Sequence, residues 1–247
     1  MQLASFKTFF LSLGILTLVL ASCGQVKTIM PPDYPAILAV SSQSELWWVS
    51  LLSNEDVKVG PIRVGFDERV SNVFDIAWSG AGTTAWAVGD EGYNLYQLNI
   101  TNGRATLVGR TGVALNALAV DAQGRLIGLA GTRVYMVNPS TGAANPVSDL
   151  TLPGLSSGDA VFADSDILYA SVGGYQGDYL VKMDLTSKQV ATVGNTGFSE
   201  VYALSFKDGV LYGATSSGAL LRIDTSTGAG VALRYAPVGL FGAQSVP

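Results

Sequence analysis

The sequence predicts an all-β fold, a five-bladed β-propeller with four-stranded antiparallel blades and a ring closed by the C-terminal strand. Three observations support this prediction. Short apolar segments recur at a step near 42 residues, each repeat has room for four strands, and the two ends of the repeat region hold complementary parts of one repeat. A period of roughly 40 to 45 residues with four short strands is typical of a propeller blade.

The first strand of each repeat is the clearest copy. Segments such as Val73–Trp78 (VFDIAW) and Val201–Phe206 (VYALSF) share a length and an apolar character. The five equivalent starts are Val73, Leu115, Gly158, Val201 and Leu240, which gives steps of 42, 43, 43 and 39 residues. A regular step of this kind indicates one structural unit that is copied along the chain.

Three more strands follow the first strand in the complete repeats. The second strands are predicted at 84–88, 125–129, 167–172 and 210–214, and the third strands at 95–99, 134–138, 180–184 and 220–224. The third strands end in Asn99, Asn138, Asp184 and Asp224, each followed by hydroxyl residues. Such acceptors cap a tight turn into a fourth strand, as in 105–109 and 191–194. Lys188 replaces the glycine of the other turns, and we expect strain there.

This pattern of Leu-Tyr, Asn or Asp, and Thr-Gly resembles the broad superfamily of bacterial WD40-like and NHL-like propeller repeats, from about Ala36 to Val246. The Trp-Asp pair of true WD40 repeats is absent. The resemblance therefore implies an architecture and no particular activity.

The ends of the repeat region predict how the ring closes. Segments 37–40 and 46–49 have the character of a second and a third strand, so the first repeat lacks its inner strand. Leu240–Ser245 is an inner strand with no repeat after it. We expect each end to complete the other. A two-sheet sandwich also has many short strands, but it explains neither the constant step nor the complementary ends.

Aromatic residues on the repeated strands are expected to pack between blades, because they lie on the alternating apolar side of each strand. They are Trp78, Trp86, Phe162, Tyr169, Phe206 and Tyr212.

The N-terminal region has the layout of a secretion signal, with Lys7 ahead of an apolar segment at Phe9–Leu20. This segment is about 12 residues long, whereas a spanning helix needs roughly 20. Leu20-Ala21-Ser22-Cys23 resembles the bacterial lipobox, and Cys23 is the only cysteine. The resemblance implies cleavage before Cys23 and a lipid on its thiol. An ordinary signal peptide with a free thiol is the alternative.

We therefore expect a lipoprotein signal peptide at 1–22, the lipidated cysteine and a flexible tether at 23–35, and the propeller at 36–247. The protein would be exported and held in the bacterial cell envelope by its lipid. Gly24 is not the aspartate that some bacteria use for inner-membrane retention, which favours the outer membrane of a two-membrane cell.

Composition excludes several kinds of chemistry. The chain has no histidine, so a Ser-His-Asp triad, a His-ligated zinc ion and a His general base are excluded. The formal net charge is -5 and no basic run occurs, which argues against binding of nucleic acid.

Polar residues gather in the loops that should share one mouth of the ring. Ligands of this architecture commonly bind on that face, which is an analogy of fold. The candidate ligand-binding residues are Asn72, Asp75, Asp90, Tyr93, Asn116, Arg133, Asp159, Tyr175, Asp178, Glu200 and Tyr202. A solvated loop surface is the competing interpretation. Gly173–Asp178 is taken as the longest departure from the repeat, and so as the place for specificity.

Three functions fit these residues. The first is a non-catalytic module that binds a protein, a glycan or a small polar ligand, with no cofactor. The second is a glycoside hydrolase with Asp75, Asp159 and Glu200 as its carboxylates, which requires suitable separations. The third is a cation site, for example for calcium, although no local calcium motif occurs. No catalytic residue is assigned.

Overall fold

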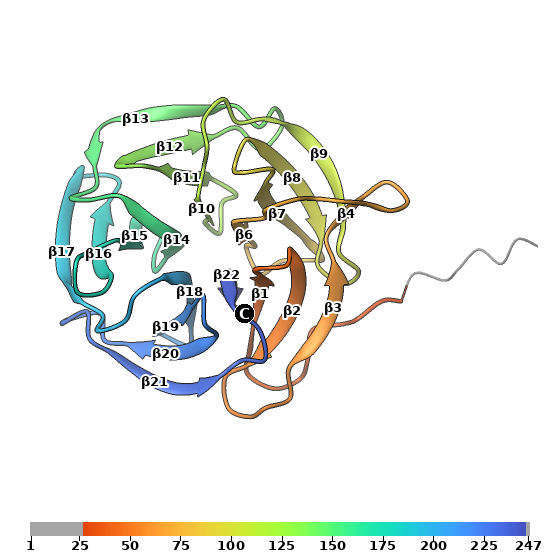
Figure 1. Ribbon diagram of the computed structural model, residues 1–247. Coiled ribbons are helices and arrows are strands. Elements are labelled where there is room, and N and C mark those ends of the chain that lie inside the picture. Colours follow the sequence, from red (N-terminus) through yellow and green to blue (C-terminus); the bar gives the residue numbers. More distant parts are fainter. Residues whose placement is uncertain (1–26, 246–247) are drawn as a thin grey trace, which may run out of the picture.

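The computed structural model describes residues 27–245, and within that range the regular elements are all β-strands. The strands form five sheets, each with a four-stranded antiparallel blade, which are arranged around a central axis (Figure 1). This confirms the predicted all-β ring of five four-stranded blades. Residues 27–245 include no helix of the length and hydrophobicity that a membrane span requires.

The blades follow one another in chain order, and each runs from an innermost to an outermost strand. Blade 1 comprises β22 (Leu240–Ser245), β1 (Ala36–Ser41), β2 (Glu45–Ser50) and β3 (Val57–Pro61). Blade 2 comprises β6 (Asp75–Ala77), β7 (Thr84–Gly89), β8 (Asn94–Asn99) and β9 (Arg104–Arg110). Blade 3 comprises β10 (Ala117–Val120), β11 (Leu126–Ala130), β12 (Arg133–Val137) and β13 (Ala144–Thr151). Blade 4 comprises β14 (Ser156–Phe162), β15 (Ile167–Val172), β16 (Tyr179–Asp184) and β17 (Gln189–Asn195). Blade 5 comprises β18 (Val201–Lys207), β19 (Val210–Thr215), β20 (Ala219–Ile223) and β21 (Gly230–Tyr235).

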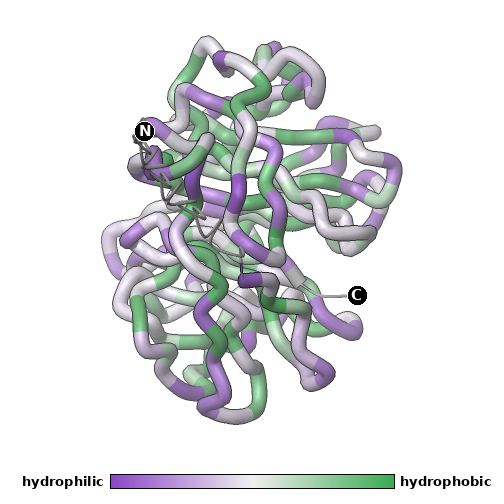
Figure 2. The backbone as a smooth tube through the Cα atoms, turned by 90° about the vertical axis from the view of Figure 1, so that its right-hand side faces the viewer, coloured by the Kyte–Doolittle hydropathy of each residue, from purple (hydrophilic) through white to green (hydrophobic). Residues whose placement is uncertain are grey.

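The hydrophobic core lies between neighbouring blades. Side chains alternate across each strand, so a blade offers one apolar face to the blade before it and one to the blade after it. Trp48 of blade 1 and Trp78 at the end of β6 meet edge to face, with ring centroids 6.1 Å apart. Trp78 and Tyr169 are buried, which confirms their expected place in the core. Viewed from its edge, the disc shows hydrophobic and hydrophilic segments in alternation along the strands (Figure 2).

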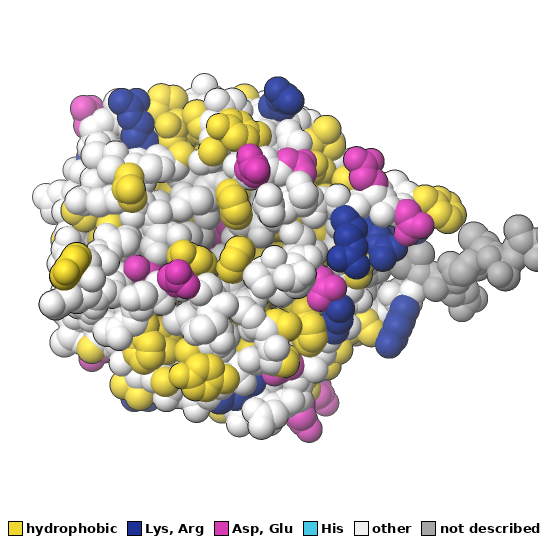
Figure 3. Space-filling view, viewed as in Figure 1, with side chains coloured by type: hydrophobic (Ala, Val, Ile, Leu, Met, Phe, Trp, Pro, Cys, Tyr) yellow, Lys and Arg dark blue, Asp and Glu magenta, His cyan; other side chains and the backbone are white. Residues whose placement is uncertain are grey.

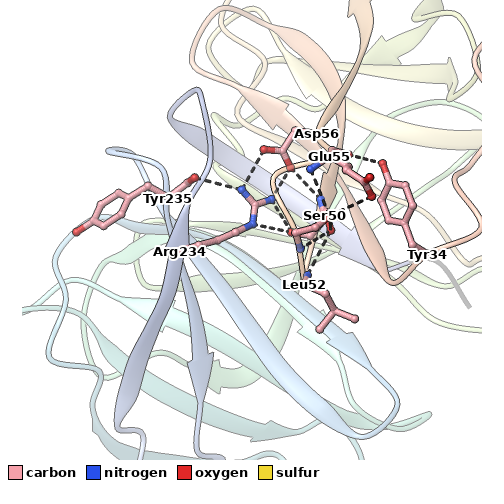
Figure 4. Close-up of polar contacts among 8 residues, drawn as sticks. Tyr34, Ser50, Leu52, Glu55, Asp56, Arg234 and Tyr235 are labelled. Carbon is pink, nitrogen blue, oxygen red and sulfur yellow. Dashed lines mark hydrogen bonds and ion pairs between the residues drawn. The ribbon is translucent and has the colours of Figure 1, made fainter.

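The ring closes as the sequence predicts. β22 is the innermost strand of blade 1 and pairs with β1, so that Ala39 lies opposite Ala243. A second link joins blade 5 to blade 1. The Arg234 guanidinium on β21 forms a buried ion pair with Asp56 and donates to the carbonyl oxygen of Ser50 at 3.0 Å (Figure 4).

We call the face where the innermost strands begin the top face, and the face where they end the bottom face. The loops that join one blade to the next, and those that join second to third strands, lie on the top face. The other turns lie on the bottom face.

The longest departure from the repeat was placed wrongly by the sequence. It is the connection from blade 1 to blade 2, where β4 (Arg63–Val64) and β5 (Glu68–Arg69) form a short hairpin. β4 lies parallel to β9 and extends blade 2 at its outer edge. The Gly173–Asp178 loop, which was expected to hold this place, is a compact connection between β15 and β16.

The described part of the predicted tether is docked on the propeller. The Ile29 amide donates to the carbonyl oxygen of Thr101 at 2.7 Å, and the Ile29 side chain packs on the core between blades 1 and 2. The Tyr34 hydroxyl donates to the carbonyl oxygen of Glu55 (Figure 4). Residues 29–35 are therefore held against the disc at its rim and bottom face. The signal segment and Cys23 lie outside the described residues.

Lys188 has the left-handed backbone conformation that its position in the repeat predicts, with φ of 61°. The equivalent residues Gly103, Gly142 and Gly228 have φ between 72° and 80°. A Cβ on Gly142 would lie 2.7 Å from the carbonyl oxygen of Gly109 in the preceding blade. Glycine in these turns therefore allows the left-handed conformation without strain, and at Gly142 it also allows close packing against the preceding blade. Lys188 adopts the same conformation with a Cβ present.

Replacing Lys188 with glycine should stabilise the protein. The left-handed conformation costs a residue with a Cβ about 1 to 2 kcal/mol, and part of this gain is offset by the greater freedom of glycine in the unfolded chain. We expect a net increase of about 1 kcal/mol in the free energy of unfolding, measured by denaturant titration. Lys188→Ala keeps the strain and is the matched control. Equal gains in both variants would show that strain is not the cause.

Candidate ligand site at the top mouth

The five innermost strands place equivalent residues in two rings around the axis. The strand pairing makes Ser157 the counterpart of Val73, so the start predicted for that repeat at Gly158 was one residue late. The ring at the top mouth consists of Phe74, Asn116, Gly158, Tyr202 and Phe241. The next ring, one residue further along each strand, consists of Asp75, Ala117, Asp159, Ala203 and Gly242, all of them buried. The first ring can meet a ligand, and the second closes the channel beneath it.

The first ring lines a pocket of about 220 Å³ together with Ser157. Its three aromatic residues, Tyr202, Phe241 and Phe74, come from three consecutive blades. Tyr202 and Phe241 meet edge to face, with ring centroids 5.5 Å apart. All three are only partly buried, so their rings are available to a molecule in the pocket.

The opposite wall is small and polar. A Cβ on Gly158 would lie 3.0 Å from Cδ1 of Tyr202, so any larger residue would push into that ring. The Asn116 side-chain nitrogen donates to the carbonyl oxygen of Ser156 at 2.9 Å. The Asn116 Oδ1 atom is buried and has no hydrogen-bond partner among residues 27–245. A bound donor could therefore satisfy it.

Two acidic side chains act on the mouth at Tyr202. Burial raises the pKa of the Tyr202 phenol, and the negative charges of Glu200 and Asp178 raise it further. No Lys or Arg is among the residues that line the pocket. On the face of the disc shown in Figure 3, Lys and Arg side chains lie toward the rim, whereas apolar and acidic side chains occur nearer the centre.

Asp75 and Asp159 lie below the mouth instead of being exposed in it, which corrects the sequence prediction of their place. Both are fully buried, and their carboxyl groups share a hydrogen bond. The Asp75 oxygens accept from the amides of Ile76 and Leu118, both at 2.6 Å. Asp159 accepts a hydrogen bond from the Ala160 amide at 2.5 Å and from backbone amides of two other blades.

Asp159 bridges three blades. Its Oδ2 accepts from the amide of Leu204 at 2.5 Å in blade 5 and from that of Ala243 at 3.2 Å in blade 1. Asp75 likewise joins blade 2 to blade 3 through Leu118. The two carboxyl groups therefore connect inner strands across the axis, and a ligand at the mouth cannot reach them directly.

Both carboxyl groups have a pKa well above the ordinary value of an aspartate. Burial raises the pKa of Asp75, and the nearby charge and hydrogen bond of Asp159 raise it further. Burial also raises the pKa of Asp159, but the hydrogen bond from Asp75 and three backbone amides stabilise its ionised form. Asp75 is therefore the carboxyl group of the pair that holds a proton more readily.

Two other predicted site residues support the loops of the mouth. Asp178 is buried and accepts from the Ser157 hydroxyl and from the Val201 amide, the latter at 2.7 Å. Asp90 accepts hydrogen bonds from the Ser71 hydroxyl at 2.9 Å, from the Tyr96 hydroxyl and from the Asn94 side-chain nitrogen. These hydrogen bonds outweigh the effect of burial and lower the pKa of Asp90. Both carboxylates therefore stabilise the conformations of loops on the top face.

The remaining predicted residues lie on the top face. Glu200 is exposed, with φ of 57°, and accepts from the Ser216 hydroxyl. Asn72 and Arg133 are exposed. Tyr93 and Tyr175 are also exposed, and the Tyr175 side chain is as accessible as in an extended peptide. Of the eleven candidates, the pocket is lined by Asn116 and Tyr202. The sequence did not single out Phe74 and Phe241.

Asp75 and Asp159, two of the three carboxylates named for a glycoside hydrolase, do not have the arrangement that its mechanism requires. Both glycosidase mechanisms need two carboxyl groups about 5 to 9.5 Å apart on either side of an accessible bond. Asp75 and Asp159 are in hydrogen-bond contact and are sealed from solvent. Among residues 27–245, no three acidic side chains are placed to hold a metal ion.

A second hollow, of about 330 Å³, lies at the bottom mouth, which the sequence did not single out. It is formed by the turns where the innermost strands end. Its lining includes Trp78, Asp121, Gln123, Phe162, Asp164 and Gln244. Asp121 is already engaged, because it forms an ion pair with Arg125.

Comparison with known proteins supports the fold. No model of a protein family matches the chain, and no curated protein matches it in sequence. A nidogen/laminin complex has a similar chain, with a TM-score of 0.55 and 13% identity over 86% of this chain and 85% of that one. TolB from Acinetobacter baumannii has a TM-score of 0.52 and 13% identity, and the match covers 83% of this chain and 54% of TolB. U3-55K has a TM-score of 0.52 and 12% identity, covering 83% of this chain and 63% of that one. At these identities the likeness extends to the propeller fold alone.

Proposed function

We propose that this chain is a non-catalytic binding protein of the bacterial cell envelope, which holds a ligand at the top mouth of its propeller. The observation that carries this proposal is the pocket formed by Phe74, Tyr202 and Phe241 on one side and Asn116 and Ser157 on the other. A concave, largely apolar site with a few convergent polar groups is the usual form of a binding site.

The proposal includes a lipid on Cys23 that attaches the protein to a membrane. Its basis is the position of the cysteine directly after the apolar segment. The docking of residues 29–35 on the rim and bottom face supports a suitable orientation, because it leaves the top mouth uncovered. A protein, a glycan or a small polar molecule could approach from the side away from the anchor.

Cys23→Ser should abolish membrane attachment. Without a thiol no diacylglycerol can be added, and two or three acyl chains provide far stronger attachment than one. We expect the variant to appear in the soluble fraction or as an uncleaved precursor, whereas wild type partitions into detergent. Mass spectrometry of the mature N-terminus is the direct measurement. A mature Cys23→Ser protein that still sediments with membranes would refute the anchor.

Removal of the aromatic wall should abolish ligand binding. The mature protein, immobilised, would be incubated with a detergent extract and a glycan fraction of the native envelope. We expect Tyr202→Ala/Phe241→Ala to retain at least tenfold less of any specifically bound molecule than wild type, because the pocket loses its two interacting rings. Asp164→Ala, at the bottom mouth, is the matched control. Equal retention by all three proteins would show that the top mouth is not the binding site.

A further inference from the structure

The top mouth has the features of a site for an organic cation. Three aromatic residues from consecutive blades, Tyr202, Phe241 and Phe74, line the pocket. Each aromatic ring has a negative face, which attracts a cation that lies within about 6 Å of its centre. The edge-to-face contact of Tyr202 and Phe241 turns the two rings at 86° to each other, as two walls of a corner.

Charge around the pocket favours the same kind of ligand. Glu200 and Asp178 both exert a negative potential at the Tyr202 phenol. Beneath the pocket lie Asp75 and Asp159, which directly follow Phe74 and Gly158 in their strands.

The same features argue against other ligands. A metal ion needs several oxygen ligands, and the wall of this pocket is mainly carbon. An anion would be repelled by the negative charges of Glu200 and Asp178. A neutral sugar could stack on the rings, but it would make no use of those charges.

We propose that the top mouth binds a quaternary ammonium group, which the three aromatic rings enclose and the buried and rim carboxylates attract. This inference rests on the proposed function and deepens it, since it names the ligand class of the same site. The pocket volume of about 220 Å³ suits one such group and little more. The group could belong to a small free molecule or to a lipid headgroup.

The test compares choline with its neutral isostere 3,3-dimethylbutan-1-ol, which has the same shape and no charge. The mature protein would be titrated with each compound, and binding would be followed by NMR shifts or calorimetry. We expect choline to bind at least tenfold more tightly than the isostere, and its affinity to fall as salt is raised. Equal affinities, or binding of the isostere alone, would overturn the proposal.

Variants separate the aromatic contribution from the apolar one. Phe241→Leu keeps an apolar side chain and removes the ring, so choline affinity should fall at least tenfold while that of the isostere stays within twofold. Tyr202→Phe keeps the ring and should retain choline binding. Asp164→Ala at the bottom mouth should change neither. Melting temperatures would confirm folding, and Phe74→Leu would replace Phe241→Leu if the latter is unfolded. A choline affinity unchanged by either Leu variant would contradict the aromatic enclosure.

Two further experiments identify the source of the cation and distinguish a failure of this inference from a failure of the proposed function. Flotation with phosphatidylcholine vesicles, compared with phosphatidylglycerol vesicles, would use the unlipidated mature domain, and selective binding to the former would assign a lipid headgroup. Binding of choline without vesicle binding would assign a free molecule. If choline fails but envelope material is still lost on Tyr202→Ala/Phe241→Ala, the cation inference fails and the proposed function stands.

Discussion

Deletion of residues 239–247 should prevent the protein from folding to a monomeric ring. β22 supplies the only inner strand of blade 1 in the described structure, and it pairs with β1 along its whole length. Its loss would expose the inner edge of β1, where every residue from Ala36 to Ser41 is buried. Such an edge would pair with another chain.

The deletion would also remove contacts that lie outside the strand pairing. Leu240 and Ala243 are buried against blade 5, and the Ala243 amide is one of the three backbone amides that donate to Asp159. Because small domains are stable by about 5 to 15 kcal/mol, the loss of a central strand exceeds what the domain can tolerate. The Arg234 contacts with Asp56 and Ser50 would remain, but they hold only the outer strands together.

Size-exclusion chromatography and thermal denaturation would measure this result. We expect aggregated or oligomeric protein without a cooperative transition, and partial recovery when a synthetic peptide of residues 239–247 is added during refolding. The matched control removes Val246 and Pro247 alone and should melt like wild type. A monomeric deletion variant with an unchanged melting temperature would reject closure by β22.

Much of this fold could be predicted because its elements repeat. The step of 42 and 43 residues, the Asn or Asp at the end of each third strand and the incomplete first repeat together specify blade number and closure. Each depends on local patterns that are copied several times, so a weak signal in one repeat is reinforced in the next. The β4–β5 hairpin occurs once and has no copy, and this is why it was missed.

The candidate site was predicted only in part, for a geometric reason. Alternation along a strand tells which residues share a face, but the tilt of the strand decides which residue reaches the mouth. Tyr202 and Phe241 occupy the mouth, and the residues that follow them turn inward to the channel. Asp75 and Asp159 are therefore one position too deep to line it. Alignment of the five repeats would have revealed the aromatic ring positions, since Phe74, Tyr202 and Phe241 are equivalent.

Gly242 shows how closely the second ring is packed. A Cβ at this position would lie 2.2 Å from Oδ1 of Asp75. The five strands therefore leave room for two carboxyl groups only because the other three positions are Ala117, Ala203 and Gly242. The sequence contains this alternation of large and small residues, but its meaning depends on the three-dimensional ring.

The buried pair should make stability depend on pH in a direction opposite to that of an ordinary salt bridge. Burial and Asp159 raise the pKa of Asp75 well above its value of about 3.9 in an unfolded chain. The native state therefore binds more protons than the unfolded state above about pH 4, so the free energy of unfolding decreases as pH rises. This stabilising contribution is complete below the unfolded pKa and is lost as pH rises through the folded pKa.

Asp75→Asn should remove this part of the pH dependence. An amide can accept from the Ile76 amide and donate to Asp159, but its nitrogen cannot accept from Leu118. One buried donor without a partner costs about 1 to 3 kcal/mol. Near pH 5 the variant should therefore be less stable than wild type. Because its own stability does not fall with the ionisation of residue 75, the difference should shrink toward pH 9.

Asp159→Asn should be more harmful at every pH, which distinguishes the two members of the pair. All the groups around Asp159 donate to it, namely three backbone amides and the carboxyl proton of Asp75. An amide nitrogen placed there would face at least one of these donors. We expect a loss of about 3 to 5 kcal/mol, as for other broken buried ionic contacts.

Urea denaturation of wild type, Asp75→Asn and Asp159→Asn between pH 5 and pH 9 would measure these effects. The chain has no histidine, so few other side chains titrate in this range. Burial also raises the pKa of Asp178, but that residue is present in all three proteins and cancels in the differences. Wild-type and Asp75→Asn stabilities that run parallel with pH would show that Asp75 does not hold the proton. Equal losses in the two variants would show that the donors around Asp159 do not distinguish it from Asp75.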